Sequence, residues 1–83
     1  FQKEFRAFLK DNPVLDFLSR LEHKRWCNSY YAMGFRYGEK KDESRKTHPC
    51  LIEDWEMVIG EKFDICHPEY DLLSVLTLFQ EER

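Results

Sequence analysis

The chain has 83 residues, of which 42% are hydrophobic, 16% aromatic and 35% charged. This length allows one small domain with one core, and this composition excludes a disordered chain. The formal net charge of −3 excludes the broad basic surface that non-specific nucleic-acid binding requires. No apolar run approaches the roughly 18 residues that a membrane span needs. We therefore expect neither a nucleic-acid partner nor membrane insertion.

The first residue is Phe1 rather than Met, so we expect a segment of a longer protein, with partners among the other domains of the parent chain. The cysteines Cys27, Cys50 and Cys66 are odd in number and widely spaced. This pattern is more typical of reduced thiols than of a disulfide framework. The sequence thus predicts a cytoplasmic protein with reduced cysteines.

Two helices are expected in the first part of the chain. Residues 2–10 place apolar side chains at helical spacing, so residues 1–12 form an N-terminal helix or extension. Asp11 or Asn12 can cap a long helix with Pro13 in its first turn, and Gly34 ends this helix, which covers about 13–33. Its expected buried stripe consists of Val14, Leu15, Leu18, Leu21, Trp26, Tyr30 and Met33.

The segment from Gly34 to about Ile52 is irregular, and so long a connection is usually functional or mobile. A turn or short helix follows over 53–58, and Gly60 ends it. The last helix covers 68–82, with an apolar face of Leu72, Leu73, Val75, Leu76, Leu78 and Phe79.

The elements together predict a mainly α, small single domain over residues 1–83. In this fold the 13–33 and 68–82 helices pack together. The irregular segment, with or without a short β pairing, lies across them and is pinned by Trp26, Tyr37, Pro49, Leu51 and Trp55.

Three motifs follow one another along the chain: Glu22-His23-Lys24-Arg25-Trp26, then Gly34-Phe35-Arg36-Tyr37-Gly38, then Lys46-Thr47-His48-Pro49-Cys50-Leu51. Trp55 and Asp64 come after them. In this order they resemble the ryanodine receptor repeat (RyR) domain, in the single-copy form found in bacterial or phage proteins. The resemblance covers about residues 18–79. Phe35 stands where the family commonly has Trp, and the stretch 54–62 departs most from the family pattern.

The resemblance implies a small, mostly helical module that is not an enzyme. Such modules occur as repeated pairs in the cytoplasmic part of intracellular calcium-release channels. In bacteria and phages they occur alone or attached to other domains, including nucleotide-binding ones. The residues that the resemblance marks as structural are Glu22, His23, Trp26, Gly34, Gly38, Pro49, Leu51, Trp55 and Asp64.

Glu22 and Arg25 lie one helical turn apart, where opposite charges pair. In one interpretation they form a partly buried ion pair that fixes the irregular segment against the helix, with Arg25 donating to its carbonyl groups. In the other, Glu22 orients Arg25 as an anchor for a phosphate or carboxylate.

Other cations and aromatics near Arg25 would complete a ligand site. A groove that combines Arg25 with Arg36, Tyr37, Lys46 and His48 suits a phosphorylated or nucleotide-like ligand. In the alternative interpretation, His48 is a structural histidine and the cations form a solvated charged surface.

No metal, cofactor or catalytic residue is predicted. His23 and Cys27 could chelate zinc together, but the chain has no CxxC or HxxxH pair. It also lacks a nucleophile turn around any serine and a glycine-rich phosphate loop.

Two functions fit the sequence. The first is a non-catalytic regulatory or sensing module that binds a small anionic or nucleotide-derived ligand and passes its occupancy to an attached domain. The second is a structural interaction module that docks on another domain or self-associates. A sensing site leaves Arg25 or Tyr37 reachable from a cleft, whereas an interaction module buries both and exposes an apolar patch.

Overall fold

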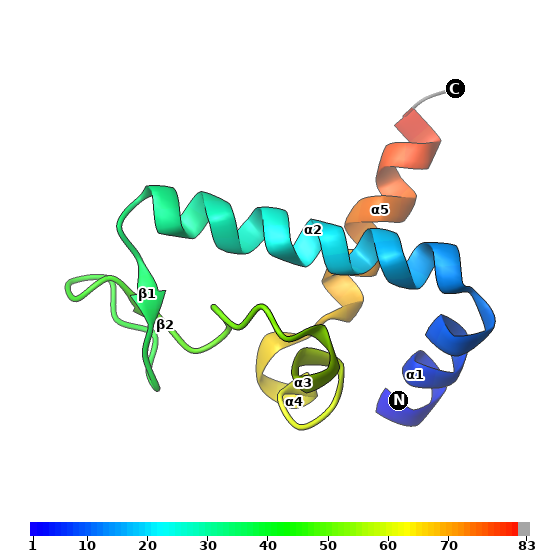
Figure 1. The fold of residues 1–83 in the computed structure, drawn as a ribbon, viewed down its shortest axis with the longest axis horizontal. Helices are drawn as coiled ribbons and strands as arrows, with labels where there is room; N and C mark the ends of the chain where they lie inside the picture. Colours follow the sequence, from blue (N-terminus) through cyan, green and yellow to red (C-terminus); the bar gives the residue numbers. More distant parts are fainter. Residues whose placement is uncertain (82–83) are drawn as a thin grey trace.

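The structure, a computed structural model, describes residues 1–81 and is built mainly of helices (Figure 1). Its elements in chain order are α1 (Gln2–Asp11), α2 (Pro13–Ala32), β1 (Arg36–Tyr37), β2 (Thr47–His48), α3 (Trp55–Ile59), α4 (Phe63–Cys66) and α5 (Glu69–Glu81). The predicted mainly α domain is confirmed. The short helix α4 was not expected, and the predicted helix end at residue 82 lies outside the described residues.

The two ends of α2 lie where local chemistry predicts them. Pro13 occupies the first turn, where its missing N–H costs no helical hydrogen bond. At the other end, the backbone N–H of Met33 donates to the carbonyls of Tyr30 and Tyr31. Gly34 then takes a φ of 91°, a conformation that residues with a Cβ rarely adopt. The helix predicted over 13–33 is therefore confirmed.

The long helices pack against each other as expected. The α2–α5 interface is the largest between any two elements of the described chain. In Figure 1, α5 crosses α2, and its C-terminal half extends past α2 on the side away from α1, α3 and α4. The apolar core lies among those three short helices and consists of Phe5, Leu9, Trp55, Val58, Ile59 and Phe63.

The buried face of α2 differs from the predicted stripe. Val14 and Met33 are exposed, whereas Ser19, His23 and Cys27 are buried. These three residues are four apart, so they share one face of the helix. The prediction chose the most apolar face of the helix. The face that is buried is instead the one that contacts other elements, and it carries polar side chains.

The apolar face of α5 is likewise less buried than predicted. Val75 is buried, but Leu73, Leu78 and Phe79 are about half exposed. Because the C-terminal half of α5 extends past α2 (Figure 1), few described residues are placed to cover it.

The irregular segment contains a two-stranded parallel sheet. Arg36 pairs with Thr47, and Tyr37 pairs with His48. Between the strands, the carboxylate of Asp42 accepts hydrogen bonds from the backbone N–H groups of Ser44 and Arg45, at 3.0 and 3.2 Å. This local turn reverses the direction of the chain within the connection between β1 and β2.

The segment is held on the helices by fewer residues than predicted. Leu51 and Trp55 are buried, and Trp26 and Pro49 are half-buried. Tyr37 is 48% exposed, so its predicted pinning role is wrong. The ring of His48 takes part instead, because it packs edge-on against Trp26 and Tyr30, with centroids 5.0 and 5.4 Å away.

Within residues 1–81, none of the helices combines the length and the apolar character needed to cross a membrane.

Candidate ligand-binding groove

A groove of about 350 Å³ lies between α2, residues 47–52 and the junction of α4 with α5. We call this the central groove and residues 47–52 the strap. The groove is lined by Glu22, His23, Arg25, Trp26, His48, Cys50, Ile65, Cys66, His67, Tyr70, Asp71 and Ser74.

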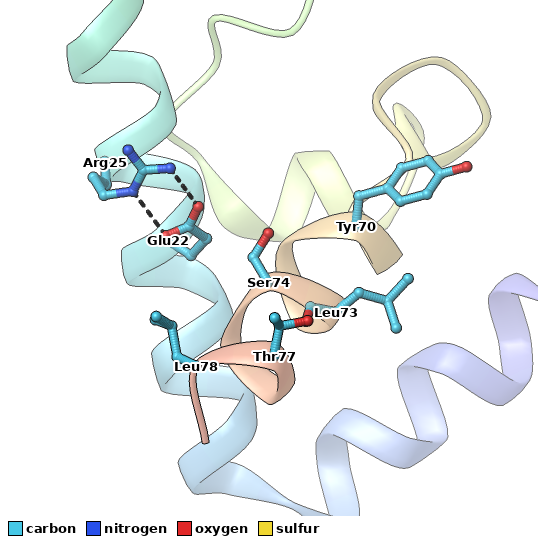
Figure 2. A pocket seen from close by; sticks show the side chains of 7 residues that line it. All are labelled: Glu22, Arg25, Tyr70, Leu73, Ser74, Thr77 and Leu78. Atoms are coloured by element: carbon cyan, nitrogen blue, oxygen red, sulfur yellow. Dashed lines mark hydrogen bonds and ion pairs between the residues drawn. The ribbon is translucent and has the colours of Figure 1, made fainter. Parts of the chain in front are cut away.

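The central groove continues along α2 and α5 into a second hollow of about 440 Å³, the outer groove (Figure 2). Four residues line both hollows: Glu22, Arg25, Tyr70 and Ser74. Arg25 therefore stands where the two grooves meet.

Arg25 and Glu22 form a two-point ion pair on the surface of α2. The Nε and Nη2 atoms of Arg25 donate to the two carboxylate oxygens of Glu22, at 2.9 and 2.7 Å. The side chain of Arg25 is 67% exposed and that of Glu22 is 14% exposed. The pair is thus partly buried, as one interpretation predicted, but among the described residues Arg25 donates to no carbonyl of the strap, so the predicted contact of Arg25 with the irregular segment is wrong. The carboxylate instead orients the guanidinium and raises the pKa of Arg25 further.

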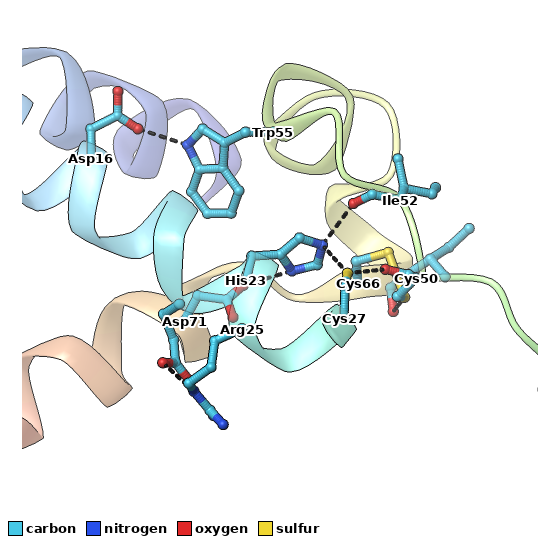
Figure 3. Close-up of polar contacts among 11 residues, drawn as sticks. Asp16, His23, Arg25, Cys27, Cys50, Ile52, Trp55, Cys66 and Asp71 are labelled. Carbon is cyan, nitrogen blue, oxygen red and sulfur yellow. Dashed lines mark hydrogen bonds and ion pairs between the residues drawn. A yellow bond between two sulfur atoms is a disulfide. The ribbon is translucent and has the colours of Figure 1, made fainter. Parts of the chain in front are cut away.

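His23 connects α2, the strap and α5 in the wall of the groove (Figure 3). Its Nε2 atom lies 2.9 Å from the carbonyl oxygen of Ile52, and its Nδ1 atom lies 3.3 Å from a carboxylate oxygen of Asp71. Both neighbours are acceptors, so both ring nitrogens carry protons and the ring is an imidazolium. Burial by itself lowers the pKa of His23, but the contacts with Asp71 and Cys27 outweigh burial and raise this pKa to about 10.

His48 presents a different protonation state to the groove. Its Nδ1 atom accepts a hydrogen bond from the backbone N–H of Cys50 at 3.0 Å. Burial first, and then the positive charge of Lys41, lower the pKa of His48. The ring is therefore neutral at pH 7, with its proton on Nε2, and this N–H is a hydrogen-bond donor.

The structure brings together two of the five predicted ligand residues. Arg25 and His48 both line the central groove. Arg36, Tyr37 and Lys46 do not: the first two lie exposed on β1, and the Nζ of Lys46 donates to the carbonyl of Met33 at 3.0 Å. β1 lies beyond the end of α2 in Figure 1, whereas Arg25 lies well inside the helix.

His67, Tyr70 and Ser74 are among the groove residues that were not predicted as ligand contacts. Tyr70 and Ser74 are four residues apart on α5, and helical spacing could have placed them on one face. His67 caps α4 in the left-handed conformation, with φ 49° and ψ 61°. A histidine in this conformation has no signal in the sequence, because the turn depends on the packing of α4 against its neighbours.

The prediction that all three cysteines are reduced is wrong. Cys50 and Cys66 form a disulfide, with their Cα atoms 5.4 Å apart, and Cys27 is free and buried. The bond joins residues 16 apart in sequence, and the fold brings the strap against α4. The spacing of the cysteines could not reveal this approach.

The residues that the resemblance marks as structural differ in their contacts. The indole Nε1 of Trp55 donates to the carboxylate of Asp16 at 2.7 Å (Figure 3). Trp26 packs against Tyr30 with ring centroids 4.5 Å apart. Asp64 is exposed in the first turn of α4.

The charges in the central groove favour a ligand that accepts hydrogen bonds. The two carboxylates that line the groove are already paired, Glu22 with Arg25 and Asp71 with His23. The groups that remain are mostly donors: the guanidinium of Arg25, the Nε2–H of His48 and the hydroxyls of Tyr70 and Ser74. Such a lining suits an anion or a polar molecule rich in acceptors.

The free thiol beside this groove is out of reach of a substrate. Cys27 Sγ lies 3.6 Å from His23 Nε2, and the other ring nitrogen of His23, Nδ1, contacts Asp71, but the thiol is completely buried. Among residues 1–81, no group of three or more His, Cys, Asp or Glu side chains is arranged to hold a metal ion.

Comparison of the chain with protein-family models, with curated proteins and with solved structures gave no match. The resemblance to the RyR domain thus stays a prediction based on the motifs of the sequence.

Proposed function

We propose that this chain is a non-catalytic sensing module, of the type that the RyR resemblance implies, and that it binds a small anionic ligand in the central groove. The observation that supports this proposal is the position of Arg25. Its guanidinium is held by Glu22, remains mostly exposed, and stands at the junction of two grooves.

The shape and lining of the groove support a ligand with a planar part as well as a charge. Trp26 and Tyr70 line the groove and offer aromatic surface. A phosphorylated molecule with an aromatic ring, such as a nucleotide, combines both features. The contacts of α2, the strap and α5 with this groove give an attached domain three elements through which occupancy could be transmitted.

A thermal-shift titration tests the proposal. The wild type is heated with inorganic phosphate, pyrophosphate, mononucleotides or cyclic nucleotides, and a ligand of the folded state raises the unfolding temperature. We expect a saturable rise for at least one of these probes. The rise should disappear in Arg25→Gln and shrink in Tyr70→Ala.

Tyr37→Ala is the matched control, because Tyr37 is an exposed tyrosine outside both grooves. Its titration should equal that of the wild type. No shift with any probe, or an equal loss in Arg25→Gln and Tyr37→Ala, would count against the sensing proposal.

An interaction module is the second candidate, because the fold exposes an apolar surface on the other side of Glu22 and Arg25 from the central groove. A cleft of about 410 Å³ between α2 and α5 is lined by Leu18, Leu21, Glu22, Arg25, Val75, Leu78 and Phe79. Leu21, Leu78 and Phe79 are each more than 40% exposed. Contiguous apolar surface of this kind is typical of docking sites.

Sedimentation over a range of protein concentrations tests this second candidate for the case of self-association. If the cleft is an interface between copies, the wild type should dimerise, and Leu78→Gln should weaken the dimer at least tenfold. Met33→Gln is the control, since Met33 is equally exposed but lies at the far end of α2. A monomer at all concentrations would leave only docking on another chain.

A further inference from the structure

We propose that the Cys50–Cys66 disulfide is a redox switch that holds the strap in place and thereby sets the shape of the central groove. The bond joins the strap to the last residue of α4, and both cysteines line the groove (Figure 3). Its importance for ligand binding rests on the proposed function, but the switch itself concerns the strap and is tested without a ligand.

The other polar attachments of the strap lead elsewhere in the fold, and Ile52 also packs against the apolar core. Toward α2, the carbonyl of Ile52 accepts the hydrogen bond of His23, and toward β1 the strap is paired through Thr47 and His48. Toward α4, Cys50 Sγ lies 3.7 Å from the carbonyl of Ile65, but a disulfide sulfur has no proton to donate to it. The disulfide is therefore the main specific link between the strap and α4.

The two sulfurs differ in how well a reductant can reach them. Cys50 is buried, whereas Cys66 is half-buried and opens onto the groove. A thiolate of a small dithiol attacks Cys66 Sγ, the bond between the two protein sulfurs breaks, and Cys50 leaves as a thiolate that takes up a proton. The second thiol of the reductant then displaces Cys66 and closes the disulfide of the oxidised reductant. Two electrons and two protons pass from the dithiol to the protein, and a small disulfide reverses the process.

The oxidised strap is held at three places: at β2 by strand pairing, at Cys50 by the disulfide, and at Ile52 by the hydrogen bond with His23. The reduced strap keeps the pairing and the His23 contact but loses the covalent link to α4. We therefore expect the central groove to have one rigid wall in the oxidised form and one mobile wall in the reduced form.

Hydrogen exchange measured by mass spectrometry tests the switch. In the oxidised wild type, the amides of residues 47–52 should exchange slowly, and a dithiol should speed their exchange at least tenfold while α2 changes little. Alkylation in denaturant should modify one cysteine before reduction and three after it.

Two variants sharpen the result. Cys27→Ser keeps the disulfide and should respond to the dithiol like the wild type. The double variant Cys50→Ser and Cys66→Ser should exchange fast at the strap with or without dithiol, and circular dichroism shows whether it remains folded. If it does not fold, the reduced wild type serves in its place.

The proposal is overturned if three cysteines are alkylated without reductant after treatment with an oxidised dithiol, or if exchange of the strap is equal in both redox forms. Titration of both forms with pyrophosphate separates it from the sensing proposal. An exchange difference without binding supports the switch and counts against the sensing proposal, whereas binding without an exchange difference overturns the switch alone.

Discussion

His23 is the residue whose environment departs most from that of a free side chain. A protonated imidazole, nearly buried, bridges the strap carbonyl of Ile52 and the carboxylate of Asp71. A buried charge is tolerated only when it is paired and hydrogen-bonded, and His23 satisfies both conditions. The positive charge therefore belongs to the folded state, and stability must depend on pH.

The pKa of His23 is about 10 in the folded protein, against 6.5 for an unperturbed histidine. The folded state thus binds the proton more tightly than the unfolded state. The stabilisation is fully present below about pH 6.5 and is lost as the pH rises through about 10. For this one group, the unfolding free energy should fall by up to about 1.4 kcal/mol per pH unit in that window. Urea denaturation at a series of pH values measures the slope.

His23→Gln separates this slope from the titration of other groups. The variant leaves Asp71 without its charged partner, so it should lose about 3 kcal/mol of stability near neutral pH and the part of the slope due to His23. His67→Gln is the control, because His67 is mostly exposed and lies beside Glu69. Equal slopes for the wild type and His23→Gln would contradict the assignment of the proton to His23.

Ser19 is also a buried polar residue, but its situation is the opposite of that of the paired His23. It is completely buried on α2, and its hydroxyl has no hydrogen-bond partner among the described residues. Ser19→Ala removes this unpaired group and should raise the unfolding free energy by about 1 kcal/mol. Ser29→Ala, in which the lost hydroxyl is exposed and donates to the carbonyl of Trp26, should change it by less than about 0.5 kcal/mol. A destabilised Ser19→Ala would show that the hydroxyl has a partner, such as a water molecule.

At the scale of the elements, the sheet of β1 and β2 depends on a close approach of Gly38 and Thr47. A Cβ atom at Gly38 would lie 2.5 Å from the Cβ of Thr47. Gly38→Ala should therefore push the strands apart and cost about 1–3 kcal/mol, as overpacking does elsewhere. Urea denaturation measures this loss.

A double-mutant cycle with Thr47→Gly identifies the cause. If the clash is with Thr47, the loss from Gly38→Ala should be smaller in the Thr47→Gly background than in the wild type. Thr47→Gly alone also loses the hydrogen bond to the carbonyl of Lys40, which the cycle subtracts. An equal loss in both backgrounds would place the cause elsewhere in the backbone.

At the scale of the whole molecule, the apolar core and the groove lie in different places. The core is formed by α1, α3 and α4, and the groove lies where α2, the strap and α5 meet. The disulfide connects these two regions, because Cys66 packs on the core and Cys50 belongs to the strap.

Loss of the disulfide should destabilise the molecule as a whole. The bond closes a loop between residues 16 apart, and a loop of this size restricts the unfolded chain by about 3 kcal/mol. Urea denaturation with and without a dithiol should differ by about this amount for the wild type and for Cys27→Ser. A difference below about 1 kcal/mol would mean that native strain offsets the gain in entropy.

The sequence by itself determined the two long helices and the ends of several helices. Pro13, Gly34 and Gly60 mark the start of α2, the end of α2 and the end of α3, as expected. These boundaries follow from the φ angles and hydrogen bonds of a few neighbouring residues, which is why they can be predicted locally. The pairing of Arg25 with Glu22 also follows from helical spacing.

Only the tertiary structure decided which faces are buried and which residues meet. The burial of Ser19, His23 and Cys27 in place of the apolar stripe, and the approach of Cys50 to Cys66, depend on contacts between residues far apart in the chain. The groove likewise unites Arg25 and His48 with Tyr70 and leaves Tyr37 outside. A polar residue can be buried wherever a distant element supplies its partner, and the identity of that partner is set by the packing of the whole chain rather than by its neighbours in sequence.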